Sequence, residues 1–232
     1  MKYRTAEDGG SYPDAQVDCY AALLWLAQGS HVGELGYDAS KLVVVGESAG
    51  AHIGTTTLMR LLARRAAVQV QAQVHICASI HYGYAPPQYC EYFPGIDHES
   101  TLYATCLSAL HTPEMMADQP PCLMVTAKDD EWNDRFRDDW VSLTLLSDIY
   151  VARLRQAGVQ AVHRHYWGPG KQKRPHCFMC NDYVGRSIWA LEALVDIGEW
   201  AHAILEQRHP PPNQYDVVRE SWPEEYINRS HP

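Results

Sequence analysis

Hydrophobic residues in this chain alternate between short continuous runs and longer stretches with helical spacing. Residues 42–45 form an uninterrupted apolar run, which is typical of a strand buried on both faces. Further strands are predicted at residues 73–80, 122–127 and 160–167, and helices at residues 13–28, 48–65, 141–157 and 184–205. Strands that alternate with helices predict an α/β fold, with a mainly parallel sheet and helices on both faces.

The first and last of these helices carry apolar stripes that should face the sheet. Ser11 can cap the first helix, and Pro13 suits its first turn. The stripe of that helix consists of Val17, Tyr20, Leu24 and Ala27. The stripe of the last helix consists of Val184, Ile188, Leu191, Val195, Gly198 and Leu205. Residues 33–40 predict a turn-rich connection.

Two segments depart from this alternation. Residues 82–119 follow no period and are rich in Pro, Tyr, Cys and His, which indicates a cap or binding loop over the strand ends. Pro211 and Pro212 mark a loosely packed C-terminal extension. We therefore predict one domain over residues 1–207 and an extension over residues 208–232.

Composition and charge narrow the function. Apolar residues make up 46% and charged residues 20%, as in an ordinary globular protein. The net charge of −9 disfavours nucleic acid and anionic lipid, since either needs a basic face. The longest apolar stretch, residues 19–27, is too short to span a bilayer, and no secretory signal opens the chain. The seven cysteines suggest no disulfide framework, so we expect reduced thiols and a cytoplasmic protein.

The segment Gly46-Glu47-Ser48-Ala49-Gly50 matches the G-x-S-x-G nucleophile elbow. A serine on a sharp strand-to-helix turn has a strained backbone, and side chains at the flanking glycine positions should collide with neighbouring segments. The turn places the hydroxyl at a helix N-terminus, where the helix dipole and the Ala49 N–H can stabilise negative charge. The alternative is a glycine-rich turn or an anion-binding loop without catalytic function.

The chain from residue 3 to about residue 207 resembles the hormone-sensitive-lipase-like esterases, which have the α/β-hydrolase fold. The resemblance includes the elbow, a Y-R-L-A-P-E-like start, a P-P-x-L…D-like acid loop and a P-H-G-F-like closing motif. The similar segments are residues 3–7, 11–15, 25–26, 35–38, 120–123, 128–130, 150–158 and 174–178. The order Ser, Asp, His along the chain is the one this fold uses.

The resemblance implies a carboxylic-ester hydrolase that acts on a small or medium ester through an acyl-enzyme, without a cofactor. Ser48 would be the nucleophile and His176 the base. Asp130 would orient the histidine, although Asp129 and Asp134 stay open as alternatives in the same acidic loop. A lactone, amide or thioester could use the same residues. The sequence also leaves a homodimer open.

The sequence gives less specific signals for substrate-binding and metal-binding residues. Tyr82 and Tyr84 belong to an aromatic cluster that either lines the substrate pocket or packs on the sheet. A zinc site could draw on His163, His165, His176, Cys177 and Cys180. Only one C-x-x-C pair is present where a structural zinc site would want regularly spaced pairs, so we predict no metal.

The chain departs from the family most clearly at its start. The family's H-G-G-G segment, which supplies oxyanion donors, would precede residue 1, and so would the first strands of the sheet. We therefore expect four parallel strands with the elbow strand at one edge, and a protein that is poorly soluble or nearly inactive. The alternative function is a non-catalytic or truncated hydrolase-like fragment. Two local departures are Ala51 after Gly50, and Cys177 in place of a glycine.

Overall fold

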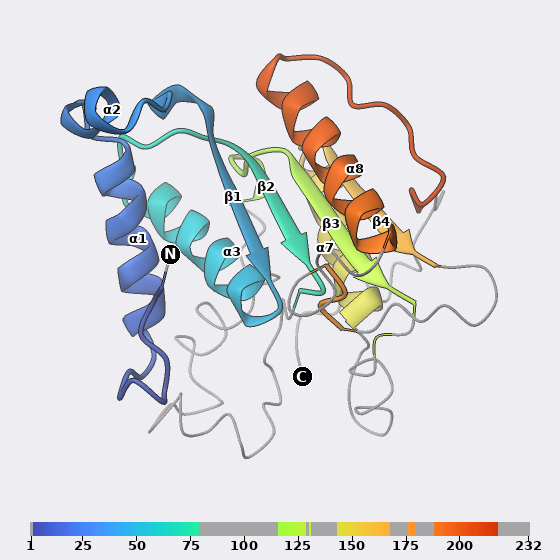
Figure 1. The fold of residues 1–232 in the computed structure, drawn as a ribbon, viewed down its shortest axis with the longest axis horizontal. Helices are drawn as coiled ribbons and strands as arrows, with labels where there is room; N and C mark the ends of the chain where they lie inside the picture. Colours follow the sequence, from blue (N-terminus) through green and yellow to red (C-terminus); the bar gives the residue numbers. More distant parts are fainter. Residues whose placement is uncertain are drawn as a thin grey trace.

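The computed structural model describes residues 2–78, 116–128, 130, 143–167, 176–179 and 188–217. Its sheet has four parallel strands in the order β1-β2-β3-β4. Their bounds are β1 (Leu42–Glu47), β2 (Val70–Ile76), β3 (Cys122–Ala127) and β4 (Ala161–Tyr166). The predicted α/β class is confirmed, and so is the edge position of the elbow strand within the described sheet. Because all strands run the same way, their carboxyl ends share one edge of the sheet (Figure 1).

Helices lie on both faces of the sheet, as the alternation predicts. In Figure 1, α8 lies in front of the sheet, α3 and α7 lie behind it, and α1 packs against α3. The helical bounds are α1 (Asp14–Leu26), α2 (Gly29–Leu35), η1 (Ala39–Lys41), α3 (Ala49–Ala63), α7 (Leu143–Gln156) and α8 (Ile188–Leu205). Gly158, with a φ of 83°, follows α7 as predicted. Within the described residues, no helix combines the length and apolar character needed to cross a bilayer.

Alternate side chains of each strand supply two separate hydrophobic cores. Cys122 and Met124 of β3 face the core beneath α3 and α7. Leu123 and Val125 face the core beneath α8, which also contains the fully buried Trp200. The strict alternation follows from the two-residue period of a strand. Because both faces of β3 are covered by a hydrophobic core, almost every position of the strand is apolar.

The start of α1 differs from the sequence prediction. Ser11 does not cap the helix with its side chain; its backbone N–H instead donates to the Asp14 carboxylate over 3.1 Å. Val17 of the predicted stripe is exposed, while the guanidinium groups of Arg60 and Arg64 lie over the Tyr20 ring. The α1 residues that line the hollow beside β1 are Cys19, Ala22, Leu23 and Leu26. The stripe prediction was therefore wrong by about one position.

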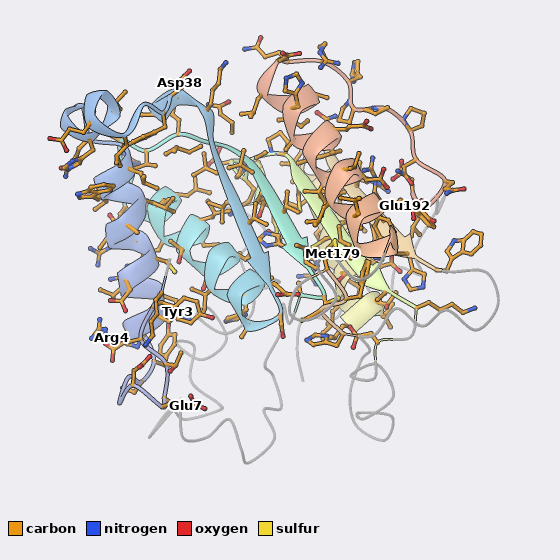
Figure 2. All side chains as sticks on the ribbon, in the orientation of Figure 1. Tyr3, Arg4, Glu7, Asp38, Met179 and Glu192 are labelled. Atoms are coloured by element: carbon orange, nitrogen blue, oxygen red, sulfur yellow. The ribbon has the colours of Figure 1, made fainter. Side chains whose placement is uncertain are left out.

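Ion pairs hold the N-terminal segment against α1. The Arg4 guanidinium lies 3.1 Å from the Asp14 carboxylate and 2.7 Å from that of Asp18. Figure 2 shows Arg4 beside the lower end of α1. Hydrogen bonds from Arg4 lower the pKa of Asp18. All three side chains are partly exposed, so the ion pairs contribute little to stability and mainly fix the direction in which the chain enters the helix.

The predicted stripe of α8 was wrong. Leu191 and Val195 are exposed by 60% and 51%, whereas Ala190, Ala193, Ile197 and Trp200 are buried. Both rows are apolar, so the helix is hydrophobic over more than one face. Val184 lies outside the described residues.

Two connecting segments are more ordered than predicted. Residues 33–40, predicted as a turn-rich connection, contain the end of α2 and the start of η1. The C-terminal segment was expected to pack loosely, yet Tyr215 is buried and its ring lies 4.5 Å from that of Tyr166. The Arg164 guanidinium also binds the Asp216 carboxylate at 2.8 Å. Tyr215 and Asp216 therefore pack against the body of the protein, whereas Pro211 and Pro212 are exposed.

The outer edge of β1 pairs with no other residue that the structure describes. Val45, on this strand, is 58% exposed, although its β-branched sequence predicts burial on both faces. A hollow of about 420 Å³ lies beside the strand, lined by residues of α1, α3 and β1. Such an edge is a ready template for pairing with another strand.

A fully buried histidine on β2 makes the free energy of unfolding depend on pH. The Nε2 of His75 lies 2.8 Å from the Gln73 Oε1 and 3.2 Å from the Thr55 Oγ1. An amide oxygen only accepts, so Nε2 donates to it. Burial, with a smaller contribution from the nearby His52, lowers the pKa of His75 to about 3, so the ring is neutral at neutral pH.

The free energy of unfolding should therefore fall as the pH drops from about 6.5 towards 3. Over that range the unfolded chain binds a proton at this histidine that the folded chain does not, and the loss is at most about 1.4 kcal/mol per pH unit. Urea denaturation at pH 7.5 and pH 5 measures it. His75→Gln should make the pH dependence shallower. Met59→Ala, which disturbs the same core and removes no titratable group, should leave the dependence unchanged. Equal dependence in wild type and His75→Gln would contradict the prediction.

Candidate active site

Ser48 lies on the sharp turn between β1 and α3. Its backbone has φ 51° and ψ −118°, in the left-handed region that side chains rarely adopt. The Ser48 N–H donates to the Ile76 carbonyl of β2 over 2.8 Å, and the Ser48 carbonyl accepts from the Ala51 N–H within α3. The turn is therefore anchored on both sides, which maintains a strained backbone at this position.

The two glycines of the motif have different roles. A Cβ on Gly46 would lie 2.4 Å from the Gly50 carbonyl oxygen and 2.6 Å from the Ala51 Cα. A Cβ on Gly50 would meet only the Tyr3 hydroxyl, at 3.9 Å. The expected collision of flanking side chains therefore occurs at Gly46 and is absent at Gly50.

The structure brings Ser48, His176 and Asp130 together from three separate segments. The His176 Nε2 lies 2.8 Å from the Ser48 Oγ, and the His176 Nδ1 lies 2.8 Å from the Asp130 Oδ2. The side chains of His176 and Asp130 are 12% and 1% exposed. Asp130 follows β3, so both it and Ser48 stand at the carboxyl ends of parallel strands. The other acid candidates, Asp129 and Asp134, lie outside the described residues.

These contacts fix the direction of the hydrogen bonds. An ionised carboxylate only accepts, so the Nδ1–H of His176 donates to Asp130. The neutral ring then presents a lone pair at Nε2, which accepts from the Ser48 hydroxyl. A histidine in this tautomer can take a proton from the serine.

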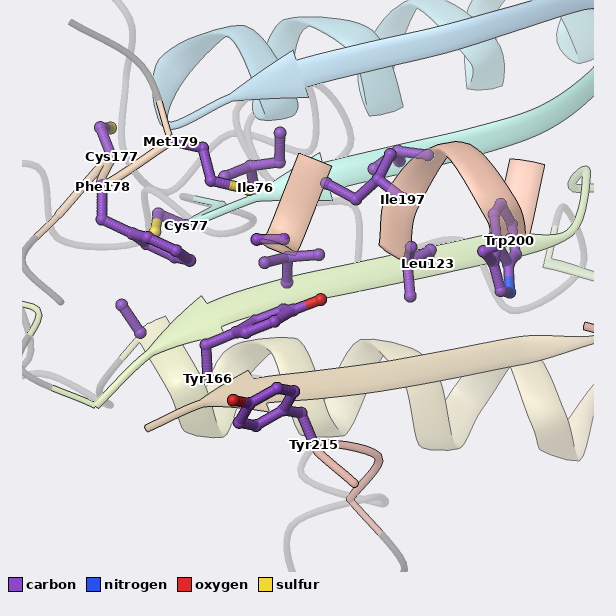
Figure 3. Close-up of a cluster of buried hydrophobic side chains, with 14 of the residues drawn as sticks. Ile76, Cys77, Leu123, Tyr166, Cys177, Phe178, Met179, Ile197, Trp200 and Tyr215 are labelled. Carbon is purple, nitrogen blue, oxygen red and sulfur yellow. The ribbon is translucent and has the colours of Figure 1, made fainter. Parts of the chain in front are cut away.

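The residues after His176 pack beneath α8. Phe178 and Met179 are buried with Tyr166, whose ring centre lies 5.7 Å from that of Phe178 (Figure 3). Cys177 has a φ of 58°, so a left-handed backbone explains why a glycine suits this position in the family that the chain resembles. Packing of the following residues holds His176 over the serine.

Comparison with known proteins assigns the family. A family described as having the alpha/beta hydrolase fold matches residues 1–179, which is more than half of the chain. The chain belongs to this family. An arylesterase of Saccharolobus solfataricus is 27% identical to this chain over 174 residues, covering 68% of the chain and 52% of the arylesterase. The chain thus spans about half the length of that relative.

Solved structures show the same fold. Brefeldin A esterase, described as a bacterial homologue of human hormone sensitive lipase, matches with a TM-score of 0.66 and 22% identity, over 89% of this chain and 59% of its own. Carboxyl esterase 2 from Tuber melanosporum matches with a TM-score of 0.64 and 22% identity, over 84% of this chain and 63% of its own. The predicted α/β-hydrolase fold is therefore confirmed.

Of the other residues that the sequence singled out, the structure describes only some. Ala49 is the first residue of α3, so its N–H lies at the positive end of the helix dipole. Tyr82, Tyr84 and Cys180 lie outside the described residues. The His163 Nδ1 lies 2.5 Å from the Asp148 Oδ1, and the His163 Nε2 lies 2.6 Å from the Thr126 Oγ1. Both ring nitrogens are therefore hydrogen-bonded within the core.

Sequence reasoning missed a cysteine at this site. Sγ of Cys77, a carboxylate oxygen of Asp130 and a ring nitrogen of His176 lie within 4.8 Å of one another. Among the described residues, these three are the group that could hold a metal ion. The one available signal is that Cys77 directly follows β2, where side chains reach the carboxyl edge of the sheet.

Proposed function

We propose that this chain hydrolyses carboxylic esters, with Ser48 as nucleophile, His176 as general base and Asp130 as the orienting acid. The observation that carries the proposal is the continuous row of hydrogen bonds from the Ser48 Oγ through His176 to Asp130, each 2.8 Å long. A serine without such a base is a poor nucleophile near neutral pH, so this row supports activation of Ser48.

In the first half-reaction, the Ser48 Oγ attacks the ester carbonyl carbon while its proton moves to the His176 Nε2. The Asp130 carboxylate stabilises the imidazolium that forms. The carbonyl oxygen becomes negative, and we propose that the Ala49 N–H and the N-terminus of α3 stabilise it. His176 then returns the proton to the departing alcohol, which leaves an acyl-enzyme.

In the second half-reaction, His176 takes a proton from a water molecule, and the resulting hydroxide attacks the acyl carbon. The tetrahedral intermediate collapses, Ser48 leaves as the protonated hydroxyl, and the carboxylic acid is released. Every proton passes through one ring nitrogen, so no cofactor enters the proposed cycle.

Carboxylic esters of small or medium size are the proposed substrates. The curated relative is an arylesterase, and the similar solved structures include a brefeldin A esterase and a carboxyl esterase, which favours esters over amides, lactones or thioesters. We propose that Tyr82 and Tyr84 line the substrate pocket, since an aromatic wall suits an apolar acyl or alcohol group.

A fluorophosphonate probe should label Ser48, because the reagent reacts with an activated serine. Ser48→Ala should abolish both the labelling and the hydrolysis of p-nitrophenyl acetate, with a loss of about 10⁴-fold or more in kcat. Intact-protein mass spectrometry measures the labelling. Ser40→Ala is the matched control, because Ser40 is exposed and its hydroxyl donates to Asp38, so labelling should persist.

Two results would contradict the proposal. Labelling that survives Ser48→Ala would exclude Ser48 as the nucleophile. A folded wild-type chain that neither reacts with the probe nor hydrolyses the ester would support the non-catalytic alternative.

A further inference from the structure

Cys77 lies against the Asp130–His176 pair, yet no step of the proposed reaction uses it. It follows β2, its side chain is fully buried, and its Sγ lies within 4.8 Å of the facing atoms of Asp130 and His176. We propose that Cys77 is a positioning residue whose S–H donates to the Asp130 carboxylate and holds it in line with the His176 Nδ1. This inference rests on, and deepens, the proposed ester hydrolysis.

A buried carboxylate requires hydrogen-bond donors, which supports this role for Cys77. Asp130 is 2% exposed, and an ionised carboxylate without hydrogen-bond donors is strongly unfavourable in such surroundings. One of its oxygens accepts from His176, and the thiol supplies a further donor from the side of β2. Two donors on different elements restrict the rotation of the carboxylate more than one donor does.

The thiol remains protonated and can therefore donate. Burial raises the pKa of Cys77 well above its usual range, and the negative charges of Asp130 and Glu47 raise it further. The backbone N–H of Cys177 donates to the sulfur and lowers the pKa of Cys77 in part. The sulfur therefore accepts from the residue after the base and donates to the acid.

Backbone strain on both sides of this contact also points to function. Cys77 has a φ of 47° and Cys177 a φ of 58°. A left-handed backbone is unfavourable for residues other than glycine, because Cβ approaches the following carbonyl oxygen. The Cys77 N–H donates to the Val125 carbonyl of β3 over 2.7 Å, which holds the strained residue in place. Strain retained beside reacting groups is typical of positions that orient them.

The competing explanation is apolar packing. Cys77 also belongs to the core that contains Phe178 and Met179, as Figure 3 shows. A thiol that only fills space would be replaced equally well by any side chain of similar size, whereas a donor requires an S–H or O–H group. Alanine and serine at this position separate the two explanations.

The test compares wild type, Cys77→Ala and Cys77→Ser in p-nitrophenyl acetate hydrolysis across pH. We expect Cys77→Ala to lower kcat about 10-fold with little change in KM, because ground-state binding does not involve the acid. The acidic limb of kcat/KM should move to higher pH, since a carboxylate that has lost a donor holds the imidazolium more strongly. Cys77→Ser should restore kcat and the pH profile to near wild type.

A second measurement, by NMR, does not depend on ester hydrolysis. The low-field proton NMR signal of the His176 Nδ1–H reports the hydrogen bond to Asp130, and it should weaken or shift in Cys77→Ala and persist in Cys77→Ser. An unchanged signal and unchanged kcat in Cys77→Ala would overturn the inference, and so would a serine variant as impaired as the alanine variant. If the wild-type protein does not hydrolyse the ester, the proposed function is contradicted. The NMR comparison of wild type and variants still decides the role of Cys77 in that case.

Discussion

Asp130→Asn should lower kcat for p-nitrophenyl acetate by about 10⁴-fold while leaving the fold intact. An asparagine of the same shape can donate its amide N–H to the His176 Nδ1. The ring would then carry its proton on Nε2, facing the Ser48 hydroxyl, and could no longer accept the serine proton. KM should change little, because binding of the ester precedes proton transfer. Steady-state kinetics with circular dichroism of the folded variant measures both properties.

The chain provides a matched control in a second buried Asp–His pair. Asp148 of α7 lies 2.5 Å from the His163 Nδ1, and both side chains are almost fully buried. Asp148→Asn makes the same chemical change away from Ser48, so it should lower stability and leave kcat within a few-fold of wild type. If Asp148→Asn reduced kcat as much as Asp130→Asn, the loss would reflect a general disturbance of the fold, and the assigned role of Asp130 would be wrong.

Gly46→Ala should destabilise the protein by about 3 kcal/mol or more and remove fluorophosphonate labelling of Ser48. The new Cβ would stand 2.4 Å from the Gly50 carbonyl oxygen and 2.7 Å from the Ala51 nitrogen, which are backbone atoms that cannot move aside without opening the turn. Since Ser48 lies within that turn, any relaxation also moves its hydroxyl away from His176. Urea denaturation and probe labelling measure the two effects.

Gly50→Ala is the control for this steric argument. Its Cβ would meet nothing closer than 3.9 Å, and alanine is favoured over glycine within a helix by about 0.5–1 kcal/mol. The variant should therefore be at least as stable as wild type. Similar destabilisation by both substitutions would show that backbone flexibility, and not the collision at Gly46, explains the glycines of the motif.

The strands could be predicted from sequence because their burial leaves a local record. The clearest records are the short, largely apolar runs of β1 and β3, and the prediction for β3, residues 122–127, matches the structure at both ends. β2 contains several polar residues, and its predicted range of 73–80 starts three residues after the observed Val70–Ile76. The faces of α1 and α8 could not be predicted in the same way. Apolar residues occupy more than one side of α8, so periodicity alone cannot distinguish Ala193 and Ile197, which face the sheet, from Leu191 and Val195, which do not.

In the candidate site too, some residues could be predicted from local sequence and others could not. Ser48 and His176 lie in short motifs whose local geometry requires particular neighbours, so pattern alone identifies them. The acid is one of several carboxylates between residues 129 and 139, and only tertiary packing places Asp130 beside the histidine. Cys77 has no local pattern at all, because its contact with Asp130 depends on how β2 lies beside β3.

The order of the sheet has a consequence for how the protein folds. Each described strand pairs with the one that follows it along the chain, so β2, β3 and β4 each add beside a neighbour that has already been synthesised. Ser48 and His176 are nevertheless 128 positions apart, and their hydrogen bond closes a loop that contains all of β2, β3 and β4. Long-range contacts of this kind form late, after the entropy of the intervening chain has been lost. The hydrogen-bonded row therefore cannot form until these strands are in register, which links the reactivity of the serine to completion of the sheet.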